Sequence, residues 1–401
     1  MKTKSFNTRF TALALIAATA AGIAAFPAIK NAQAIQNTPT VINQTEDRRI
    51  EVVFVLDTTS SMSGLIQAAK DKIWSIASTM ASAQQNPEIK MGLVAFRDRG
   101  DAYVTRVFDL SSDLDSMYAS LMDFRAQGGG DGPESVNQAL YDAIHKISWS
   151  QDGKVYKVAF LVGDAPPHMD YADDVKYPET LAAAKRKGIV VNTIQSGRHQ
   201  YTRPAWREIA SLGNGEYFQV EDSGNAVAVA TPYDEELSRL AAELEDTRLF
   251  YGNEETRAAQ KAKIDAGAKL RKELSPEALA RRSAYNATRS GEKNLLGESE
   301  LVDAVTSGRV ELDDIAEENL PSSLQLMEPA EQMEVISEQA KRRDELKREI
   351  GKLSESRDRF IKEKVAADGG AEDSLDEKIY HAVKDQAASV GLTYDSESAK
   401  Y

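Results

Sequence analysis

Short apolar runs alternate with stretches of helical spacing from Arg48 to about Pro232. Buried strands that read as continuous apolar runs, separated by amphipathic helices, are typical of a mostly parallel sheet covered on both faces. The pattern predicts strands at Ile50–Leu56, Lys90–Phe96, Ala102–Phe108, Val155–Val162, Gly188–Ile194 and Glu216–Val220. It predicts helices at Ser63–Ala81, Leu114–Phe124, Val136–Ile147, Thr180–Lys187 and Pro204–Ser211.

One pair of predicted strands is antiparallel. The turn-forming sequence Arg97-Asp-Arg-Gly-Asp101 joins the second strand to the third. Only antiparallel strands can be joined by so short a connection. We therefore expect an α/β fold with a doubly wound, mostly parallel six-stranded sheet and one antiparallel edge strand.

The second part of the chain, residues 233–401, has a different composition. It is rich in Glu, Lys, Arg, Ala, Leu and Ser and has almost no β-branched runs, which predicts helices joined by polar loops. Within Glu331–Val365, apolar residues recur at a coiled-coil spacing that Arg343 and Arg357 interrupt, so this segment is partly coiled-coil-like or a solvated helical hairpin. A last helix is expected between the capping sequence Ser374-Leu-Asp-Glu377 and Gly391.

The first residues have the pattern of a secretory signal peptide, residues 1–34. Basic residues precede the apolar run Phe10–Phe26, and Asn31-Ala-Gln-Ala34 supplies a small-x-small cleavage site. An uncleaved membrane anchor is the alternative, but the run is short and rich in alanine. Residues 35–47 are expected to be a polar linker, residues 48–232 the α/β domain and residues 233–401 the helical region.

Net charge and cysteine content restrict the cell compartments and the classes of partner that we expect for this protein. The net charge of −14 becomes −18 without the presequence, which carries four basic residues and no acid. Phosphate backbones would be repelled, which argues against nucleic acid as the partner. The chain has no cysteine, so it forms no disulfide and carries no lipid-modified cysteine. These features predict a periplasmic or secreted bacterial protein with no stable membrane insertion after signal cleavage.

Oxygen-bearing residues follow two of the buried strands. Asp57, Thr59 and Ser61 come directly after the first strand, and Asp164 follows the strand Val155–Val162. Ligands of open α/β sheets bind beyond the carboxyl ends of the strands, where such loops converge. Magnesium takes six oxygen ligands, and proteins hold it through one or two carboxylates. A divalent-cation site is therefore expected at this edge, although a helix cap with turn hydroxyls would use the same residue types.

The sequence Asp57-x-Thr59-x-Ser61, the glycine-rich loop 128–135 and Asp164 resemble the metal-ion-dependent adhesion site (MIDAS) of von Willebrand factor A (VWA) domains. This resemblance implies a Rossmann-like VWA fold from Arg48 to about Pro232. It also implies a bound divalent cation, with Mg²⁺ expected and Ca²⁺ or Mn²⁺ as alternatives. The implied partner is a protein that completes the metal shell with an acidic side chain.

The middle ligand departs from the family's pattern. The family commonly has a threonine after the glycines, whereas this chain offers Asp131 as the candidate ligand, with Glu134 and Ser135 nearby. A third carboxylate would lower the net charge of the site, weaken its attraction for an acidic partner and favour calcium. An ordinary turn remains the alternative for Asp131. Glu134, Ser135 and His168 are candidates for the rim of the site, and an exposed loop is the alternative for His168.

Common catalytic constellations are missing from the sequence. It has no cysteine, four histidines in total, no Gly-x-Ser-x-Gly elbow and no His-Glu-x-x-His helix. The leading hypothesis is therefore a non-enzymatic, exported, metal-dependent protein-binding module for adhesion or assembly. The alternatives are a structural envelope protein with an internally saturated metal that binds partners through its helical region, and a metal-assisted hydrolase.

Overall fold

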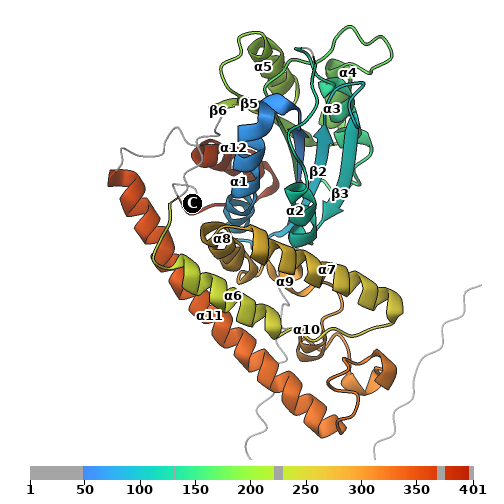
Figure 1. The fold of residues 1–401 in the computed structure, drawn as a ribbon, viewed down its shortest axis with the longest axis vertical. Helices are drawn as coiled ribbons and strands as arrows, with labels where there is room; N and C mark the ends of the chain where they lie inside the picture. The colour runs from blue at the N-terminus through green and yellow to red at the C-terminus, as the bar shows by residue number, and fades with distance from the viewer. Residues whose placement is uncertain (1–47, 131, 221–228, 368–374, 397–401) are drawn as a thin grey trace, which may run out of the picture. The chain divides into compact units, whose positions relative to one another are not determined.

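The computed structural model describes residues 48–130, 132–220, 229–367 and 375–396, which are coloured in Figure 1. The predicted signal peptide and linker, residues 1–47, lie outside the described residues, and so does Asp131. No helix in the described part of the chain combines the length and the hydrophobicity needed to cross a membrane.

A six-stranded sheet has the strand order β3-β2-β1-β4-β5-β6. Neighbouring strands are parallel except β2 and β3, which pair antiparallel and place β3 at an edge. The expected fold class is therefore confirmed. The strands are β1 (Arg49–Asp57), β2 (Glu88–Phe96), β3 (Thr105–Ser111), β4 (Tyr156–Gly163), β5 (Ile189–Ser196) and β6 (Asn214–Val220).

Helices cover both faces of the sheet. Successive side chains of a strand point to opposite faces. In β1, Val52 and Phe54 pack with α1, α2 and α12, whereas Val53 and Val55 pack with α3, α4 and α5. The helices of this layer are α1 (Ser63–Ala81), α2 (Leu114–Met122), α3 (Val136–His145), α4 (Tyr177–Arg186), α5 (Thr202–Leu212) and α12 (Leu375–Ala387), and a short 3₁₀ helix, η1 (Ser60–Met62), precedes α1.

Helix α12 belongs to the core of the sheet although it follows β6 by more than a hundred residues of sequence. Its buried Tyr380 and Val383 share the apolar cluster that contains β1 and α1. Figure 1 shows α12 beside α1. Gly391, expected to end the last helix, has a left-handed φ of 78°. The domain boundary near residue 232 stays a prediction, but the core of the sheet also draws on this late helix.

The helical region consists of α-helices and short 3₁₀ turns. It contains α6 (Asp234–Asp246), α7 (Glu254–Glu273), α8 (Pro276–Asn286), α9 (Glu292–Leu296), α10 (Leu301–Thr306) and α11 (Pro329–Ala367). Helix α11 is continuous over 39 residues, so the alternative of a helical hairpin within it is wrong. Leu346 and Ile350 of α11 pack with α6, α8 and α9 rather than forming an isolated coiled coil.

The two arginines that interrupt the apolar spacing of α11 are buried in ion pairs. Arg343 donates to both carboxylate oxygens of Glu300 at 3.0 and 2.9 Å. Arg357 donates to Asp234 at 2.8 Å. A buried charge is tolerated when it is paired and hydrogen-bonded. The interruptions in the pattern are therefore sites where α11 is tied to α6 and to the start of α10.

Another buried ion pair ties the helical region to the sheet domain. Arg282 of α8 donates to both oxygens of Asp115 in α2, at 2.7 and 2.6 Å, and lies 2.6 Å from Glu245 of α6. All three side chains are almost fully buried. The helical region is therefore held against α2 by charge as well as by apolar contact.

Candidate metal site

The topology of the sheet brings the two predicted carboxylates together. Asp57 is the last residue of β1, and Asp164 follows the last residue of β4, the strand that pairs with β1. A Cβ on Gly163 would lie 3.0 Å from the Cβ of Asp57. Glycine at position 163 therefore lets the β4 end approach Asp57 closely enough for both loops to share one site.

A chain of hydrogen bonds links the four residues of the predicted motif. Oδ1 of Asp57 accepts from the backbone N–H and the hydroxyl of Thr59, at 2.9 and 2.6 Å. The hydroxyls of Thr59 and Ser61 lie 3.2 Å apart, and Ser61 donates to Oδ1 of Asp164 at 3.0 Å. Two carboxylates and two hydroxyls thus converge, as the sequence predicts.

The alternative of a simple helix cap does not describe this loop. Thr59 is the N-cap of η1 and Met62 is the N-cap of α1, and neither makes a side-chain cap hydrogen bond. The hydroxyls of Thr59 and Ser61 are directed to the carboxylates instead. Their oxygens therefore remain next to the position that a cation would take.

The glycine-rich loop packs directly against the Asp57–Ser61 loop. The backbone N–H of Ser60 donates to the carbonyl of Gly128 at 3.2 Å, and that of Gln127 donates to Thr58 at 3.1 Å. Gly129 has a left-handed φ of 78°, and a Cβ there would lie 3.4 Å from the Cβ of Thr59. Glycine is needed for both the conformation and the close approach.

Glu134 brings a further carboxylate to this edge of the sheet. Its backbone pairs with the loop after β4, donating to Pro166 at 2.9 Å and accepting from His168 at 3.1 Å. Its side chain is 3% exposed, and Oε1 would lie 3.2 Å from a Cβ on Gly129. Oε2 is buried and has no hydrogen-bond partner within the described residues.

Sequence reasoning assigned Glu134 to the rim and Asp131 to the middle ligand position. Asp131 lies outside the described residues, so that assignment stays a prediction. Glu134 is instead buried beside Thr59. The signal that could have favoured it is its position two residues before α3, where the chain must already have returned to the sheet edge.

The site carries more negative charge than its surroundings neutralise. Burial, with a smaller effect of Asp164, raises the pKa of Asp57 to about 7, although hydrogen bonds from Thr59 and the charge of Arg97 oppose the shift. Burial and the nearby carboxylates, Asp57 foremost, raise the pKa of Glu134 to about 9. A divalent cation would favour the ionised forms of both groups.

A second layer of polar residues supports the site. It contains the candidate rim residues Ser135 and His168, whereas Asp98 and Tyr171 were missed by sequence reasoning. Asp98, from the β2–β3 turn, accepts from Ser135 at 2.7 Å and from Tyr171 at 2.8 Å. His168 lies 3.4 Å from Asp98, stacks on Tyr171 and contacts Asp170 at 2.8 Å. His168 is 4% exposed, so the alternative of an exposed loop is wrong for this residue.

The donor set fits a hard divalent cation that uses hydroxyl as well as carboxylate ligands. Asp57, Asp164, Thr59 and Ser61 offer only oxygen, which Mg²⁺, Mn²⁺ and Ca²⁺ prefer. Within the described ranges, no group of three or more His, Asp and Glu side chains is arranged to hold a metal by itself. The hydroxyls of Thr59 and Ser61 would therefore supply part of the shell of such a cation. Glu134, whose buried Oε2 has no hydrogen-bond partner within the described residues, lies nearby.

Residues 51–230 match the model of the von Willebrand factor A domain family. This part of the chain is a VWA domain. The match spans all six strands and the loops of the candidate metal site. It ends before the helical region and does not include α12.

Solved structures that match part of this chain include a mussel byssus protein and the SpRpn10 VWA domain. Proximal thread matrix protein 1 of the mussel byssus is 17% identical, over 44% of this chain and 42% of that chain, with a TM-score of 0.34. The same protein with a zinc-occupied MIDAS motif is 18% identical, over 43% and 41%, with a TM-score of 0.34. The SpRpn10 VWA domain is 14% identical, over 44% and 89%, with a TM-score of 0.34.

A curated protein is also similar to part of this chain. A putative ariadne-like RING finger protein of Acanthamoeba polyphaga mimivirus is 22% identical over 235 residues, which are 52% of this chain and 22% of that protein. The aligned part thus spans about a fifth of the curated relative's length. The similarity gives no activity for this chain.

Proposed function

We propose that the VWA domain binds a protein partner at a divalent cation held by Asp57, Thr59, Ser61 and Asp164. The observation that carries the proposal is the unbroken chain of hydrogen bonds from Asp57 through Thr59 and Ser61 to Asp164. Ser61 is exposed, so the site is accessible from solvent at this end. Such a cation supplies a positive centre that attracts an acidic side chain of the partner.

Mg²⁺ is the proposed metal, with Mn²⁺ and Ca²⁺ as competitors. Proteins usually hold Mg²⁺ through one or two carboxylates with neutral oxygen ligands in the remaining positions, and the proposed ligand set has this composition. Glu134 would add a third negative charge from within the chain. Its contribution decides how strongly the cation attracts an acidic partner, because each internal carboxylate lowers the net charge of the site.

A second candidate function follows from the burial of Glu134. If Glu134 saturates the metal, the cation ties the loops after β1 and β4 together, and partners bind through the helical region instead. The unpartnered Oε2 of Glu134, buried at the sheet edge, favours this alternative. Chelation would then lower the melting temperature while the folded protein still binds its partner.

The proposed role is binding rather than catalysis, in an exported protein. A serine nucleophile gives its proton to a histidine, whereas Ser61 donates its hydrogen bond to the carboxylate of Asp164 and His168 contacts the carboxylates of Asp98 and Asp170. The predicted signal peptide supports export to the periplasm or the medium. Bacterial expression of the full chain followed by mass determination of the mature N-terminus tests export directly.

The decisive experiment is partner capture from a bacterial envelope extract. Wild type, Asp57→Ala and the control Asp265→Ala are compared with Mg²⁺ and with EDTA, and cross-linking maps the contact. Asp265 is exposed and pairs with Lys261 on α7. Capture that needs metal and Asp57, with cross-links near Ser61, supports the proposal. Capture that persists with EDTA and in Asp57→Ala, cross-linked to the helical region, supports the structural alternative.

A further inference from the structure

Residues 310–340 of the helical region (the acidic segment) carry charge of one sign. They contain nine Asp and Glu residues and no Lys, Arg or His, so they contribute −9 to a chain whose net charge is −14. All nine acidic residues are exposed, and none of them makes an ion pair within the described part of the chain. They are Glu311, Asp313, Asp314, Glu317, Glu318, Glu328, Glu331, Glu334 and Glu338. Their negative charge is therefore available to a partner.

A leucine side chain lies fully in solvent on the acidic segment. Leu326 is 96% exposed. The side chain of the preceding residue, Gln325, donates to the carbonyls of Glu318 and Leu320 at 3.5 and 3.0 Å. These bonds hold the turn that carries Leu326 against the 3₁₀ helix η3 (Glu317–Asn319). An apolar side chain is thus presented close to the two carboxylates of η3 on a fixed turn.

The acidic segment is folded on a core of its own. Leu312, Leu324 and Ile336 are buried and pack with Leu301 and Val302 of α10. Within the described residues, this apolar cluster draws only on the helical region. The carboxylates and Leu326 therefore lie on the outer side of a packed unit, where a second molecule could contact them.

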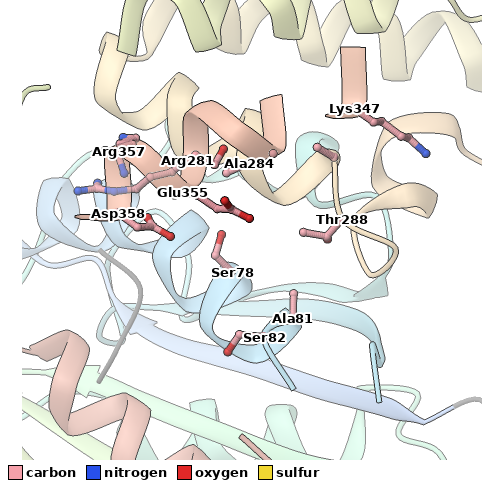
Figure 2. Close-up of a pocket in the computed structure, with 13 residues that line it drawn as sticks. Ser78, Ala81, Ser82, Arg281, Ala284, Thr288, Lys347, Glu355, Arg357 and Asp358 are labelled. Atoms are coloured by element: carbon pink, nitrogen blue, oxygen red, sulfur yellow. The ribbon is translucent and has the colours of Figure 1, made fainter. Parts of the chain in front are cut away.

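The contact between the helical region and the VWA domain offers no comparable surface. Helices α1, α8 and α11 meet around a cavity of about 240 Å³ (Figure 2). Charges of both signs line it, and Figure 2 shows Arg281 and Asp358 among them. Lys347 and Arg357, also in the lining, pair with carboxylates of the helical region. Opposite charges already face one another here, whereas the acidic segment has no internal counter-charge.

The edge of the VWA domain that holds the candidate metal site also exposes apolar side chains. Tyr201 is 89% exposed and directly precedes Thr202, whose hydroxyl donates to the carbonyl of Asp164 at 2.6 Å. Met169, 49% exposed, lies in the loop after β4 that also carries Asp164. Tyrosine and methionine are enriched at protein interfaces. A cation at this edge would therefore have exposed apolar side chains in the loops next to it.

We infer that the partner of the metal site is a second copy of this chain, and that the acidic segment of one copy binds at the metal site of the next. A carboxylate of η3 completes the shell of the cation, and Leu326 packs against Tyr201. The inference rests on the proposed divalent-cation site. Because the interface joins two different surfaces of the same chain, a dimer keeps one free surface of each kind, and assembly continues into a filament or closes into a ring.

The cation is needed because both surfaces are acidic without it. Asp57 and Asp164 lie at the metal-site edge, and Asp170 and Asp173 of the neighbouring loop are 73% and 74% exposed at their side chains. Like charges that face each other across an interface oppose association. A bound divalent cation provides the positive centre that the acidic segment lacks within its own chain. Self-association should therefore depend on the metal.

The test is sedimentation velocity of the full chain at about 1 to 100 µM, a range that brackets a Kd of about 10 µM. About 0.15 M salt shortens the Debye length to about 8 Å, so the net charges of two copies are screened while a direct contact with the cation persists. With Mg²⁺, the average mass is expected to rise with concentration to that of dimers and larger species. With EDTA, the chain is expected to stay monomeric.

Variants at exposed positions connect self-association to the acidic segment. Glu317→Gln/Glu318→Gln removes the carboxylates of η3 and should weaken self-association at least about tenfold. Glu355→Gln/Glu363→Gln is the matched control, because it removes two exposed carboxylates further along α11, and affinity should stay within about threefold. Leu326→Ala should weaken self-association about three- to tenfold. Melting curves verify that each variant folds.

A mixture of two variants tests whether the two surfaces bind each other. Asp57→Ala loses a metal ligand but keeps the acidic segment, whereas Glu317→Gln/Glu318→Gln keeps the metal site. Each variant alone should self-associate at least about tenfold more weakly than wild type. An equimolar mixture with Mg²⁺ should form heterodimers and no larger species, because each pair has a single intact interface.

Metal-dependent self-association that Glu317→Gln/Glu318→Gln weakens, the matched control keeps and the mixture restores supports the inference. Association that persists in EDTA, equal behaviour of the two double variants, or a mixture that does not associate overturns it. Isothermal titration with Mg²⁺ separates this inference from the proposed function. A chain that binds Mg²⁺ and captures an envelope protein but stays monomeric refutes the self-association alone, whereas a chain that binds no divalent cation refutes both.

Discussion

The hydroxyl of Ser61 donates a hydrogen bond to Asp164 across 3.0 Å, although 103 residues separate them in the sequence. The sheet topology produces this contact, because β1 and β4 are adjacent and parallel and both loops leave the same edge. Ligands of doubly wound folds bind at such an edge, beyond the carboxyl ends of the strands. The two loops therefore form one candidate site and should respond together when either is changed.

Removal of the charge of either carboxylate should strongly weaken metal binding. Asp57→Asn and Asp164→Asn each remove a charge from a low-dielectric site, and we expect each to weaken Mg²⁺ or Mn²⁺ binding by about a hundredfold. Ser61→Ala removes a neutral ligand and should weaken binding less, by about tenfold. Isothermal titration of the metal-free protein measures all three. The control Asp265→Asn changes an exposed carboxylate on α7 and should bind as wild type. Wild-type affinity in Asp57→Asn would show that the cation binds elsewhere.

Substitution of Glu134 should change which metal and which partner the site prefers. Glu134→Gln keeps the shape but removes a negative charge, so affinity for Ca²⁺ should fall by about tenfold and more than affinity for Mg²⁺. Glu134→Thr provides the hydroxyl that the family's pattern has and should increase the attraction for an acidic peptide. Competition titrations with both metals provide the measurement. An unchanged ratio of the two affinities would remove Glu134 from the metal site.

The hydrophobic pattern predicted most of the sheet because the strands are buried on both faces. Five parallel strands and the antiparallel edge follow from apolar runs and one turn sequence. The pattern could not show that α12 completes the core, because its apolar residues look the same whether they pack on the sheet or on another helix. Nor could it show that Arg343 and Arg357 are buried, because their partners Glu300 and Asp234 are distant in the sequence.

The candidate site was only partly predictable. Asp57, Thr59, Ser61 and Asp164 lie at strand ends, where local pattern and topology give their position. Glu134 and Asp98 depend on how long loops fold back to the sheet, and no local periodicity specifies that. The glycines of loop 128–135 indicated a ligand loop but not which carboxylate it would bring to Thr59.

Stability of the metal-free protein should fall as pH rises from about 4 to 7. Burial raises the pKa of Asp57 from 3.8 to about 7, so in this range the folded state keeps a proton that the unfolded state has released. The unfolded state then binds fewer protons, and the free energy of unfolding decreases with pH, by up to about 4 kcal/mol for this group. Urea unfolding at several pH values in EDTA measures the slope.

Metal should reverse this dependence. Saturating Mg²⁺ keeps Asp57 ionised in the folded protein, so stability should rise through about pH 4 and metal affinity should rise up to about pH 7. Asp57→Asn is the control, since it should lose this part of the slope in EDTA and gain little from Mg²⁺. The same slope in wild type and Asp57→Asn would assign the titration to another group.

Gly163→Ala should weaken both the fold and the metal site. The added Cβ would lie 3.0 Å from the Cβ of Asp57 and 3.2 Å from Trp206, both in the buried core. We expect a loss of about 1–3 kcal/mol of stability and weaker metal binding, because Asp57 must move. Gly153→Ala is the matched control, because a Cβ there meets nothing within 4 Å. Unfolding curves and metal titrations of both variants test the prediction, and equal behaviour of the two would contradict it.

Arg282→Met should destabilise the attachment of the helical region more than the substitution of an exposed charged residue does. The substitution leaves Asp115 and Glu245 buried without their shared cation, which costs about 3–5 kcal/mol. Burial opposes the ionisation of Asp115, but Arg282 holds the pKa of Asp115 at about 2. The free energy of unfolding that this ion pair contributes to wild type should therefore be lost as pH falls from about 4 to 2. Arg239→Met is the control, because Arg239 pairs with Glu236 on the exposed face of α6 and should change stability by less than about 1 kcal/mol. Denaturation followed by tryptophan fluorescence measures both variants, since Trp74 packs against Tyr285 of α8 at this contact. If the Arg282→Met variant were as stable as the Arg239→Met variant, apolar packing alone would hold α8 against the VWA domain.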